Sequence, residues 1–205
     1  MKSIYIYGAS GHGLVVADIA KACGYEDIIF VDDADNEYLS FEDIKSEKNI
    51  PIAFGVGNNQ IRAELFEKVK SNGLKTPSLI HPSAVISPSA KIGDATIVMP
   101  NVVINAKATI GDSAILNSGC IVEHECVIED FVHISPNVAL GGAVKVGKFT
   151  HVGIGSNVIQ GVMIGQNTII GGGSVVIRNI EDNQKVAGVP VKVILPTLNR
   201  GGGKQ

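Results

Sequence analysis

The stretch from Ile110 to Ile134, IGDSAILNSGCIVEHECVIEDFVHI, has an aliphatic residue at every sixth position. The spacing continues in both directions without an insertion or deletion, and sixteen residues follow it: Ile86, Ile92, Val98, Ile104, Ile110, Leu116, Val122, Ile128, Ile134, Leu140, Val146, Val152, Val158, Ile164, Ile170 and Val176. A β-strand repeats its apolar residues every second position and an α-helix about every 3.6 residues, so neither element explains this period. A coil with flat sides six residues long explains it, because each side then turns one aliphatic side chain inward.

Neighbouring positions of the repeat also follow rules. Two residues before each aliphatic residue the chain has only small or branched side chains, among them Cys120 and Cys126. We interpret these cysteines as core residues and not as nucleophiles. The residue after the aliphatic one is Gly or Asn at nine of the sixteen places, which we interpret as corners with positive φ. Three sides would make a triangular turn of about 18 residues, and stacked turns would place equivalent residues about 4.8 Å apart.

The composition agrees with such a core and excludes several classes of protein. The chain has 205 residues, of which 24 are glycine, with no tryptophan and only 5% aromatic residues. A formal charge of −3 argues against nucleic acid as a partner, since a phosphate backbone attracts a basic surface. No apolar run is long enough to span a membrane, and the three cysteines form no disulfide framework. The N-terminus lacks a signal-peptide pattern, so we expect a cytoplasmic protein.

The first eighty residues follow a different plan. Apolar runs predict three strands, and stretches with helical spacing after the first and third strands predict two helices. The strands are expected at residues 4–7, 28–31 and 50–56, and the helices at residues 14–23 and 60–70. This order is an α/β arrangement of the Rossmann-like βαβ type, with a parallel sheet.

A glycine-rich loop, GASGHG at residues 8–13, joins the first strand to the first helix. It departs from the dinucleotide fingerprint G-x-G-x-x-G, yet its glycines let a phosphate approach the backbone at a helix N-terminus. Asp32 and Asp33 follow the second strand and have oxygens that can accept from a ribose hydroxyl or a uracil N–H. The alternative is a tight turn and a solvated pair of aspartates.

Two prolines, Pro77 and Pro82, flank the change from this plan to the six-residue repeat. We therefore expect a nucleotide-binding domain at residues 1–80 and a β-helix at residues 81–180. Residues 181–205 are expected to form a closing segment and a flexible tail.

His124 is the histidine whose surroundings favour catalysis. It lies between two acids in Glu123-His-Glu125, and an adjacent carboxylate favours the imidazolium and orients the ring of a general base. Gly142 lies 18 residues later, so its N–H is expected about one strand spacing from His124, as a donor to an oxyanion. The alternative is a solvated histidine at an acidic surface corner.

Two further histidines occupy another side of the triangle. His133 lies nine residues after His124, which is half a turn, so the two rings are not expected to meet within one subunit. They can meet if coils pack side by side, and three-fold cyclic packing is one arrangement that does this. His151 lies 18 residues after His133 and is expected to stack on it.

The whole chain resembles the bacterial nucleotide-sugar N-acetyltransferases of the bacillosamine, perosamine and sialic-acid O-acetylase-like group, most closely the bacillosamine branch. The matching motifs are IYIYGASGHG at residues 4–13, VGNN at 56–59, VINA at 103–106 and EHEC at 123–126. Residues 80–177 resemble the left-handed parallel β-helix of hexapeptide-repeat proteins, and the handedness follows from this resemblance alone. Residues 186–192 resemble the closing stretch of many such acyltransferases, with Val191 where alanine is usual.

The resemblance implies an acetyl transfer from acetyl-CoA to the 4-amino group of a UDP-linked amino-deoxy sugar, in a homotrimer with active sites between subunits. His124 would be the base, Glu125 would raise its basicity, and Gly142 would donate to the oxyanion. Residues that match positions holding the UDP-sugar are Ser10, Gly11, His12, Asp32, Asp33 and Gly57. Residues that match positions contacting acetyl-CoA are His133, Ile154 and Gly172. No metal is expected.

Three alternatives remain open on the sequence. One is an acetyltransferase for another nucleotide amino sugar, such as a perosamine or sialic-acid precursor. A second is a zinc enzyme of the γ-carbonic anhydrase type, also a left-handed helix trimer, with ligands from His124, His133 and His151. The third is a scaffold without catalysis, which leaves the Glu-His-Glu motif and the glycine loop without a role.

Overall fold

The structure is a computed structural model that describes residues 2–196. Its first part is a three-stranded parallel sheet in the order β2-β1-β3, formed by β1 (Ser3–Tyr7), β2 (Asp27–Val31) and β3 (Ile52–Phe54). The helices are α1 (Gly11–Ala22), α2 (Phe41–Ile44) and α3 (Asn59–Ser71). The predicted α/β arrangement is confirmed, although the short helix α2 was not expected from the apolar pattern.

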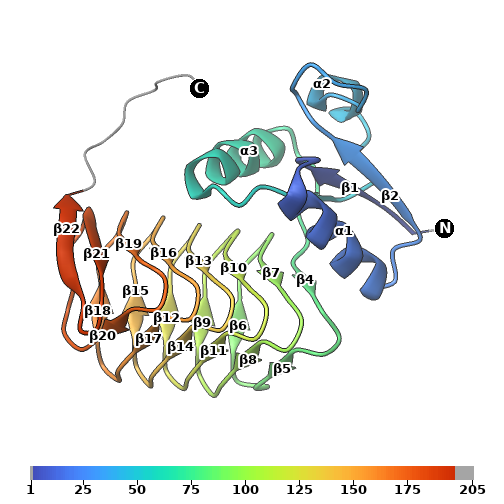
Figure 1. Cartoon of the computed structure of the whole chain (residues 1–205). Coiled ribbons are helices and arrows are strands. Elements are labelled where there is room, and N and C mark those ends of the chain that lie inside the picture. The colour runs from blue at the N-terminus through green and yellow to red at the C-terminus, as the bar shows by residue number, and fades with distance from the viewer. Residues whose placement is uncertain (1, 197–205) are drawn as a thin grey trace.

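The second part is a β-helix of three sheets (Figure 1). From β4 to β20 the strands are parallel and their paired residues are 18 apart, whereas β21 pairs with β19 at a spacing of 16 and β22 is antiparallel to β21. The first sheet contains β4 (Leu79–Ile80), β7 (Ile97–Val98), β10 (Ile115–Leu116), β13 (His133–Ile134), β16 (His151–Val152), β19 (Ile169–Ile170), β21 (Gln184–Ala187) and β22 (Lys192–Pro196). The second contains β5 (Val85–Ile86), β8 (Val103–Ile104), β11 (Ile121–Val122), β14 (Ala139–Leu140), β17 (Asn157–Val158) and β20 (Val175–Val176). The third contains β6 (Lys91–Ile92), β9 (Thr109–Ile110), β12 (Val127–Ile128), β15 (Lys145–Val146) and β18 (Met163–Ile164).

The aliphatic residues of the repeat fill the inside of this coil. From Val98 to Val176 each of them is at most 4% exposed, whereas Ile86 and Ile92 in the first turn are half-buried. From Thr96 to Ser174 the slot two residues earlier is buried as well, and Cys120 and Cys126 are both 0% exposed there. Burial raises the pKa of the Cys120 thiol to about 12, so these cysteines are core residues, as the repeat predicted.

The corners differ from the prediction in one respect. Positive φ occurs three residues after the aliphatic residue, for example at Ala95, Lys107 and Phe149, and not at the glycine that directly follows it. That glycine is required for a different reason, because a Cβ at Gly111 or Gly147 would lie within 2.8 Å of the backbone of the next coil. Glycine at this position therefore permits close stacking of the turns and does not supply a left-handed conformation.

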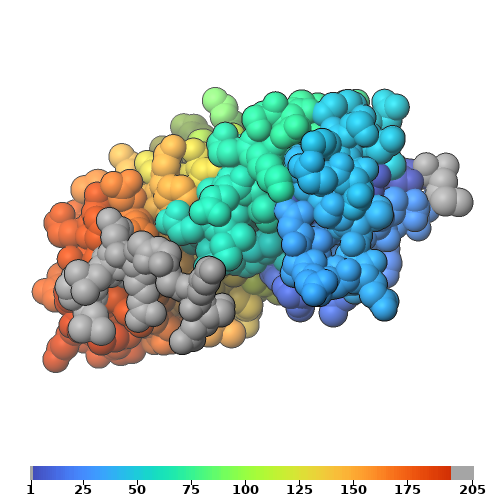
Figure 2. Space-filling model, turned by 90° about the horizontal axis from the view of Figure 1, so that it is seen from above, coloured from blue at the N-terminus to red at the C-terminus, as the bar shows by residue number. Residues whose placement is uncertain are grey.

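The N-terminal domain lies against the outer face of the first sheet, and Figure 2 shows it resting along the coils. The outward-facing Ile97 and Ile115 are 0% exposed and share one apolar cluster with Ile4 and Ile6 of β1. Outward side chains of an uncovered sheet would be exposed to solvent. The burial of Ile97 and Ile115 therefore shows that the N-terminal domain packs on the first sheet. This contact positions the glycine loop beside the coils that carry His133 and His151.

The ends of the β-helix lie close to the predicted boundaries. β4 pairs with β7 and so belongs to the first sheet before residue 80, while β21 continues that sheet beyond residue 180. The division at residues 80 and 180 stays a prediction, and the tail from residue 197 lies outside the described residues. Within residues 2–196 no helix has the length and apolar character needed to cross a bilayer. The cytoplasmic location stays a prediction.

Candidate active site

His124 lies at the corner between β11 and β12, where Glu125 takes a left-handed backbone conformation with φ of 60°. The imidazole Nδ1 lies 3.2 Å from Oε2 of Glu125, and the backbone N–H of His124 donates to Oε2 of Glu123 at 3.3 Å. The side chains of His124 and Glu125 are 60% and 55% exposed. The pair therefore places an oriented imidazole at the surface, with Nδ1 toward the Glu125 carboxylate and Nε2 free to act as a base.

Gly142 lies one turn after His124, as the 18-residue spacing predicted. A Cβ on Gly142 would lie 2.6 Å from both Cε1 and Nε2 of the His124 ring. The same corner holds Ala106 one turn before His124 and Gln160 one turn after Gly142, so the backbone here accepts a side chain. Glycine is needed because the imidazole occupies the space of its side chain. Within the described residues, the N–H of Gly142 has no hydrogen-bond acceptor.

The glycine loop divides into packing glycines and an open one. A Cβ on Gly13 would lie 2.1 Å from the carbonyl oxygen of Gly8, and one on Gly55 would lie 2.4 Å from the same atom. These glycines let the loop, α1 and β3 approach closely. Gly11 has no heavy atom within 4 Å of its Cβ position, and it begins α1 after Ser10. An anion can therefore reach the helix N-terminus at Gly11.

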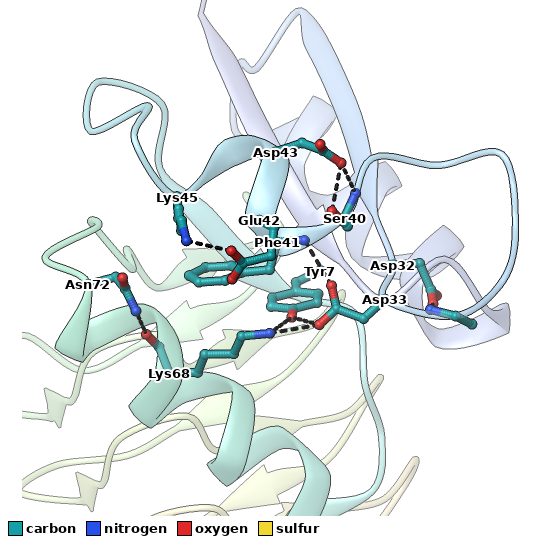
Figure 3. Close-up of polar contacts among 11 residues, drawn as sticks. Tyr7, Asp32, Asp33, Ser40, Phe41, Glu42, Asp43, Lys45, Lys68 and Asn72 are labelled. Atoms are coloured by element: carbon teal, nitrogen blue, oxygen red, sulfur yellow. Dashed lines mark hydrogen bonds and ion pairs between the residues drawn. The ribbon is translucent and has the colours of Figure 1, made fainter.

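The two aspartates after β2 have different surroundings, shown in Figure 3. Asp32 accepts from the N–H of Ala9 in the glycine loop at 3.1 Å. Asp33 accepts from the Tyr7 hydroxyl, from Lys68 Nζ at 2.8 Å and from the N–H of Phe41 at 2.8 Å. Burial alone would raise the pKa of Asp33, but the hydrogen bonds from Lys68, Phe41 and Tyr7 lower it. Asp33 thus connects β1, α2 and α3 through hydrogen bonds, whereas Asp32 contacts the glycine loop directly.

Three histidines meet where the glycine loop touches the first sheet. The rings of His133 and His151 stack at 4.7 Å with an interplanar angle of 7°, and His12 lies 6.2 Å from His133. The Asn117 amide lies 3.2 Å from Nε2 of His133, and Ser135 Oγ lies 2.8 Å from Nε2 of His151. Desolvation lowers the pKa of His12 to about 4 and, together with the neighbouring His151 and Arg62, that of His133 to about 3. These rings are neutral at pH 7.

His124 lies at the corner between the second and third sheets, whereas His133 and His151 lie on strands of the first sheet, so the separation expected from the half-turn spacing is found. Ile154 and Gly172 are neighbours one turn apart, with the Gly172 Cβ position 3.1 Å from Cγ2 of Ile154, and Ile154 is 59% exposed. They lie at the corner between the first and second sheets, one corner away from His124. A ligand that touches all of these residues therefore needs more than one side of the coil.

Arg62 on α3 is a buried cation that we did not single out in the sequence. Its side chain is 0% exposed and donates only to uncharged oxygens: Ser113 O at 2.8 Å, Phe131 O at 3.0 Å, Asn59 Oδ1 at 2.8 Å, and Val56 O and Gly57 O at 3.2 Å. Desolvation lowers the pKa of Arg62 to about 9, which leaves it charged at pH 7. The sequence signal that could have identified it is its helical spacing from Phe66 and Val69, which places all three residues on the buried face of α3.

A small cavity of about 190 Å³ lies at this junction. The N-terminal domain lines it with Gly57, Asn58, Asn59 and Gln60, and the β-helix lines it with Phe149, His151, Asn167 and Ile169. Gly57 is thus a predicted substrate contact at the junction of the two parts, as is His12 beside His133. The Gly57 Cβ position is 4.0 Å from the His12 ring.

The zinc site of the γ-carbonic anhydrase alternative is not assembled within one chain. Among residues 2–196, no three or more His, Cys, Asp or Glu side chains are arranged to hold a metal ion. His124, His133 and His151 do not converge within one chain, because His124 lies at the corner between the second and third sheets and the other two lie on the first sheet.

Comparison with known proteins gives independent evidence about the family to which the chain belongs. A family model described as the PglD N-terminal domain matches residues 3–69. UDP-N-acetylbacillosamine N-acetyltransferase of Bacillus subtilis is 37% identical over 113 residues, which cover 48% of this chain and 51% of that enzyme. The match therefore spans about half the length of this curated relative.

Solved structures match nearly the whole chain. A variant of perosamine N-acetyltransferase from Caulobacter crescentus, in complex with CoA and GDP-perosamine, is 35% identical over 94% of this chain and 96% of that one, with a TM-score of 0.90. The acetyltransferase domain of PglB from Neisseria gonorrhoeae, in complex with acetyl coenzyme A, is 36% identical over 94% and 99%, with a TM-score of 0.89. With its oriented His124–Glu125 corner on a left-handed parallel β-helix, this chain belongs to the bacterial nucleotide-sugar N-acetyltransferases.

Proposed function

We propose that the protein transfers the acetyl group of acetyl-CoA to the 4-amino group of a UDP-linked amino-deoxy sugar of the bacillosamine type. The observation that carries this proposal is the corner at which the His124 ring, oriented by Glu125, lies over a glycine with an unpaired N–H. A base next to a free backbone donor suits attack of an amine on a thioester carbonyl. The relatives that bind CoA or acetyl-CoA support the choice of donor.

In the proposed mechanism the sugar amine attacks the thioester carbonyl directly. His124 Nε2 accepts the proton lost by the amine as the carbon–nitrogen bond forms, and the Gly142 N–H donates to the oxyanion of the tetrahedral intermediate. The intermediate collapses with cleavage of the carbon–sulfur bond, and the imidazolium returns the proton to the CoA thiolate. No acyl-enzyme is required, and Cys120 and Cys126 are buried in the core.

The nucleotide would bind at the glycine loop, with its phosphates near Ser10 and Gly11 at the start of α1 and with His12, Asp32, Asp33 and Gly57 around it. Gly11 offers open space at a helix N-terminus, which attracts anions. Acetyl-CoA would lie along the corner of Ile154 and Gly172, near His133. Because this corner and His124 are on different edges of one coil, we propose a homotrimer in which neighbouring subunits complete each site.

A second candidate differs only in the nucleotide sugar. The matched perosamine N-acetyltransferase was solved with GDP-perosamine, which makes a GDP-linked 4-amino sugar the alternative substrate. The base and the donor would act in the same way, so the choice depends on the glycine-loop domain.

The test is CoA release from acetyl-CoA with a panel of nucleotide sugars: the UDP-linked 4-amino sugar of the bacillosamine type, GDP-perosamine, and each with the 4-amino group replaced by hydroxyl. We expect release with the UDP-amino sugar and an N-acetylated product by mass. General-base removal typically costs about 10²- to 10⁴-fold in rate, so His124→Ala should lower kcat by that order. Absence of product with every amino sugar, or an unchanged rate in His124→Ala, would refute the proposal.

A further inference from the structure

Arg62 connects the two parts of the molecule at a repeating feature of the β-helix. Ser113, Phe131 and Phe149 are equivalent corner residues of three successive turns, 18 apart, and each has positive φ. Arg62 binds the first two carbonyls, while Asn59 Nδ2 donates to the carbonyl of Phe149 at 2.9 Å and lies 3.3 Å from that of Thr150. Two side chains of α3 therefore contact the same corner in three consecutive turns.

The same guanidinium holds the loop that follows β3. Its Nη1 lies 3.2 Å from the carbonyl oxygens of both Val56 and Gly57, so one side chain joins this loop to two turns of the coil. The loop in turn lines the cavity at the domain junction and lies beside His12. A planar fork of five N–H donors suits this set of diverging carbonyls, and a lysine ammonium does not.

Arg62 has no ion-pair partner among the described residues. No carboxylate within the described residues lies at ion-pair distance, and all five of its hydrogen bonds end on carbonyl or amide oxygens. A buried cation without a counter-charge is costly unless its donors are satisfied. Apolar residues would have packed this interface at lower cost, as Phe66 does against Phe131 in the same region.

We propose that Arg62, with Asn59, is a positioning residue that sets the height and orientation of the Val56–Gly57 loop on the β-helix, and thereby the binding of the nucleotide sugar. This inference rests on the proposed function, since it concerns the same nucleotide site. Arg62 touches no substrate in this role. It acts through the loop carbonyls, and it fixes which turn of the coil the nucleotide domain faces.

The test compares Arg62→Gln with a matched control, Lys70→Met. The control removes another contact between α3 and the β-helix, the ion pair of Lys70 with Asp94 at 2.9 Å, without touching the loop. Calorimetry with UDP, GDP and acetyl-CoA gives binding without turnover. Arg62→Gln loses charge-assisted hydrogen bonds that hold the Val56–Gly57 loop on the coil. We therefore expect it to weaken binding of the preferred nucleotide about tenfold or more and to change acetyl-CoA binding less than twofold. Lys70→Met should change neither.

Chemical rescue separates positioning from stability. In Arg62→Ala, free guanidinium at non-denaturing concentrations should restore part of the nucleotide affinity, since it can fill the vacated fork site. Nucleotide binding equal to the parent in folded Arg62→Gln, with only a lower Tm, would overturn the inference. If that variant does not fold, Asn59→Ala, which keeps Arg62, should still weaken nucleotide binding several-fold, and unchanged binding would overturn it. A parent protein that binds no nucleotide would instead overturn the proposed function.

Discussion

At the scale of single residues, the site depends on what one turn of the coil presents to the next. Gly142 illustrates this, since Ala106 and Gln160 occupy its position in other turns and only the His124 ring forbids a side chain there. The 18-residue spacing made this neighbourhood predictable from the sequence. The role of Arg62 was not predictable in the same way, because four of its five hydrogen bonds are to backbone carbonyls, which every residue has.

Gly142→Ala tests this contact directly. The new Cβ would lie 2.6 Å from two ring atoms of His124, so the imidazole must move from its place beside Glu125. We expect kcat to fall by about 10²-fold, because a misplaced base loses most of its contribution, while Tm changes little at this exposed corner. Steady-state kinetics with circular dichroism checks both. Gln160→Ala, one turn further, is the control, and an unchanged kcat in Gly142→Ala would contradict the assigned geometry.

At the scale of elements, a six-residue period replaces the usual patterns of strand and helix. Each strand from β4 to β20 is only two residues long, with one side chain inward and one outward, so the alternation of a longer strand cannot appear. The period predicted the buried column correctly, from Ile134 to its equivalents at Val152 and Ile170. It did not show which residue turns the corner, since the left-handed positions carry residues as different as Lys107, Phe131 and Gly155.

Ile134→Asp tests the register of the coil. Ile134 is 0% exposed in the first sheet, and a carboxylate there would be buried without a partner. The substitution should lower the free energy of unfolding by several kcal/mol, on the order of 3–5 for an uncompensated buried charge. Thr109→Asp is the matched control, because Thr109 is the exposed, outward residue of another two-residue strand. Equal urea midpoints for the two variants would show that the inward column is wrongly assigned.

At the scale of the whole molecule, three imidazoles meet where the two parts are in contact, with His133 buried and His12 and His151 half-buried. His12 comes from the glycine loop, whereas His133 and His151 come from successive turns of the β-helix. The stacking of the latter two was predictable from their spacing. The contact with His12 was not, because no periodicity relates the N-terminal domain to the coil.

These histidines predict a dependence of stability on pH. The pKa of His12 is lowered to about 4 and that of His133 to about 3, both mainly by desolvation, against about 6.5 in an unfolded chain. At a pH between the folded and the unfolded pKa, the unfolded chain binds protons that the folded protein does not. The free energy of unfolding therefore has its full value above about pH 6.5 and falls as the pH decreases below it. Each group contributes about 1.4 kcal/mol per pH unit in this range.

Urea unfolding at pH 7 and pH 5 measures this effect. Both pH values lie above the range in which most carboxylates become protonated. The free energy of unfolding should be lower at pH 5 by about 2–4 kcal/mol in the parent. His12→Gln should reduce this difference, since one of the groups no longer titrates. A parent protein equally stable at both values would mean that these rings are not desolvated in solution.

The proposed trimer is tested by mixing two inactive variants. His124→Ala removes the base, and Ile154→Glu places a charge at an exposed corner where the anionic CoA would lie. Ile154 is a better choice than His133, which is only 9% exposed and contacts His12 of its own chain, so that its loss would also disturb the nucleotide domain. Neither variant alone forms a complete site, because every interface in its homotrimer lacks the same group.

Refolding an equal mixture should restore about a quarter of the parent activity, since each mixed cyclic trimer contains one interface with both groups intact. Restoration requires that His124 and Ile154 at one site come from different chains. The mass of the mixed assemblies confirms that exchange occurred, and mixing without unfolding gives the baseline. If mixed trimers form and remain inactive, the base and the acetyl-CoA corner of one chain must serve the same site. Separate corners of one coil would then have to be joined by a single bound acetyl-CoA.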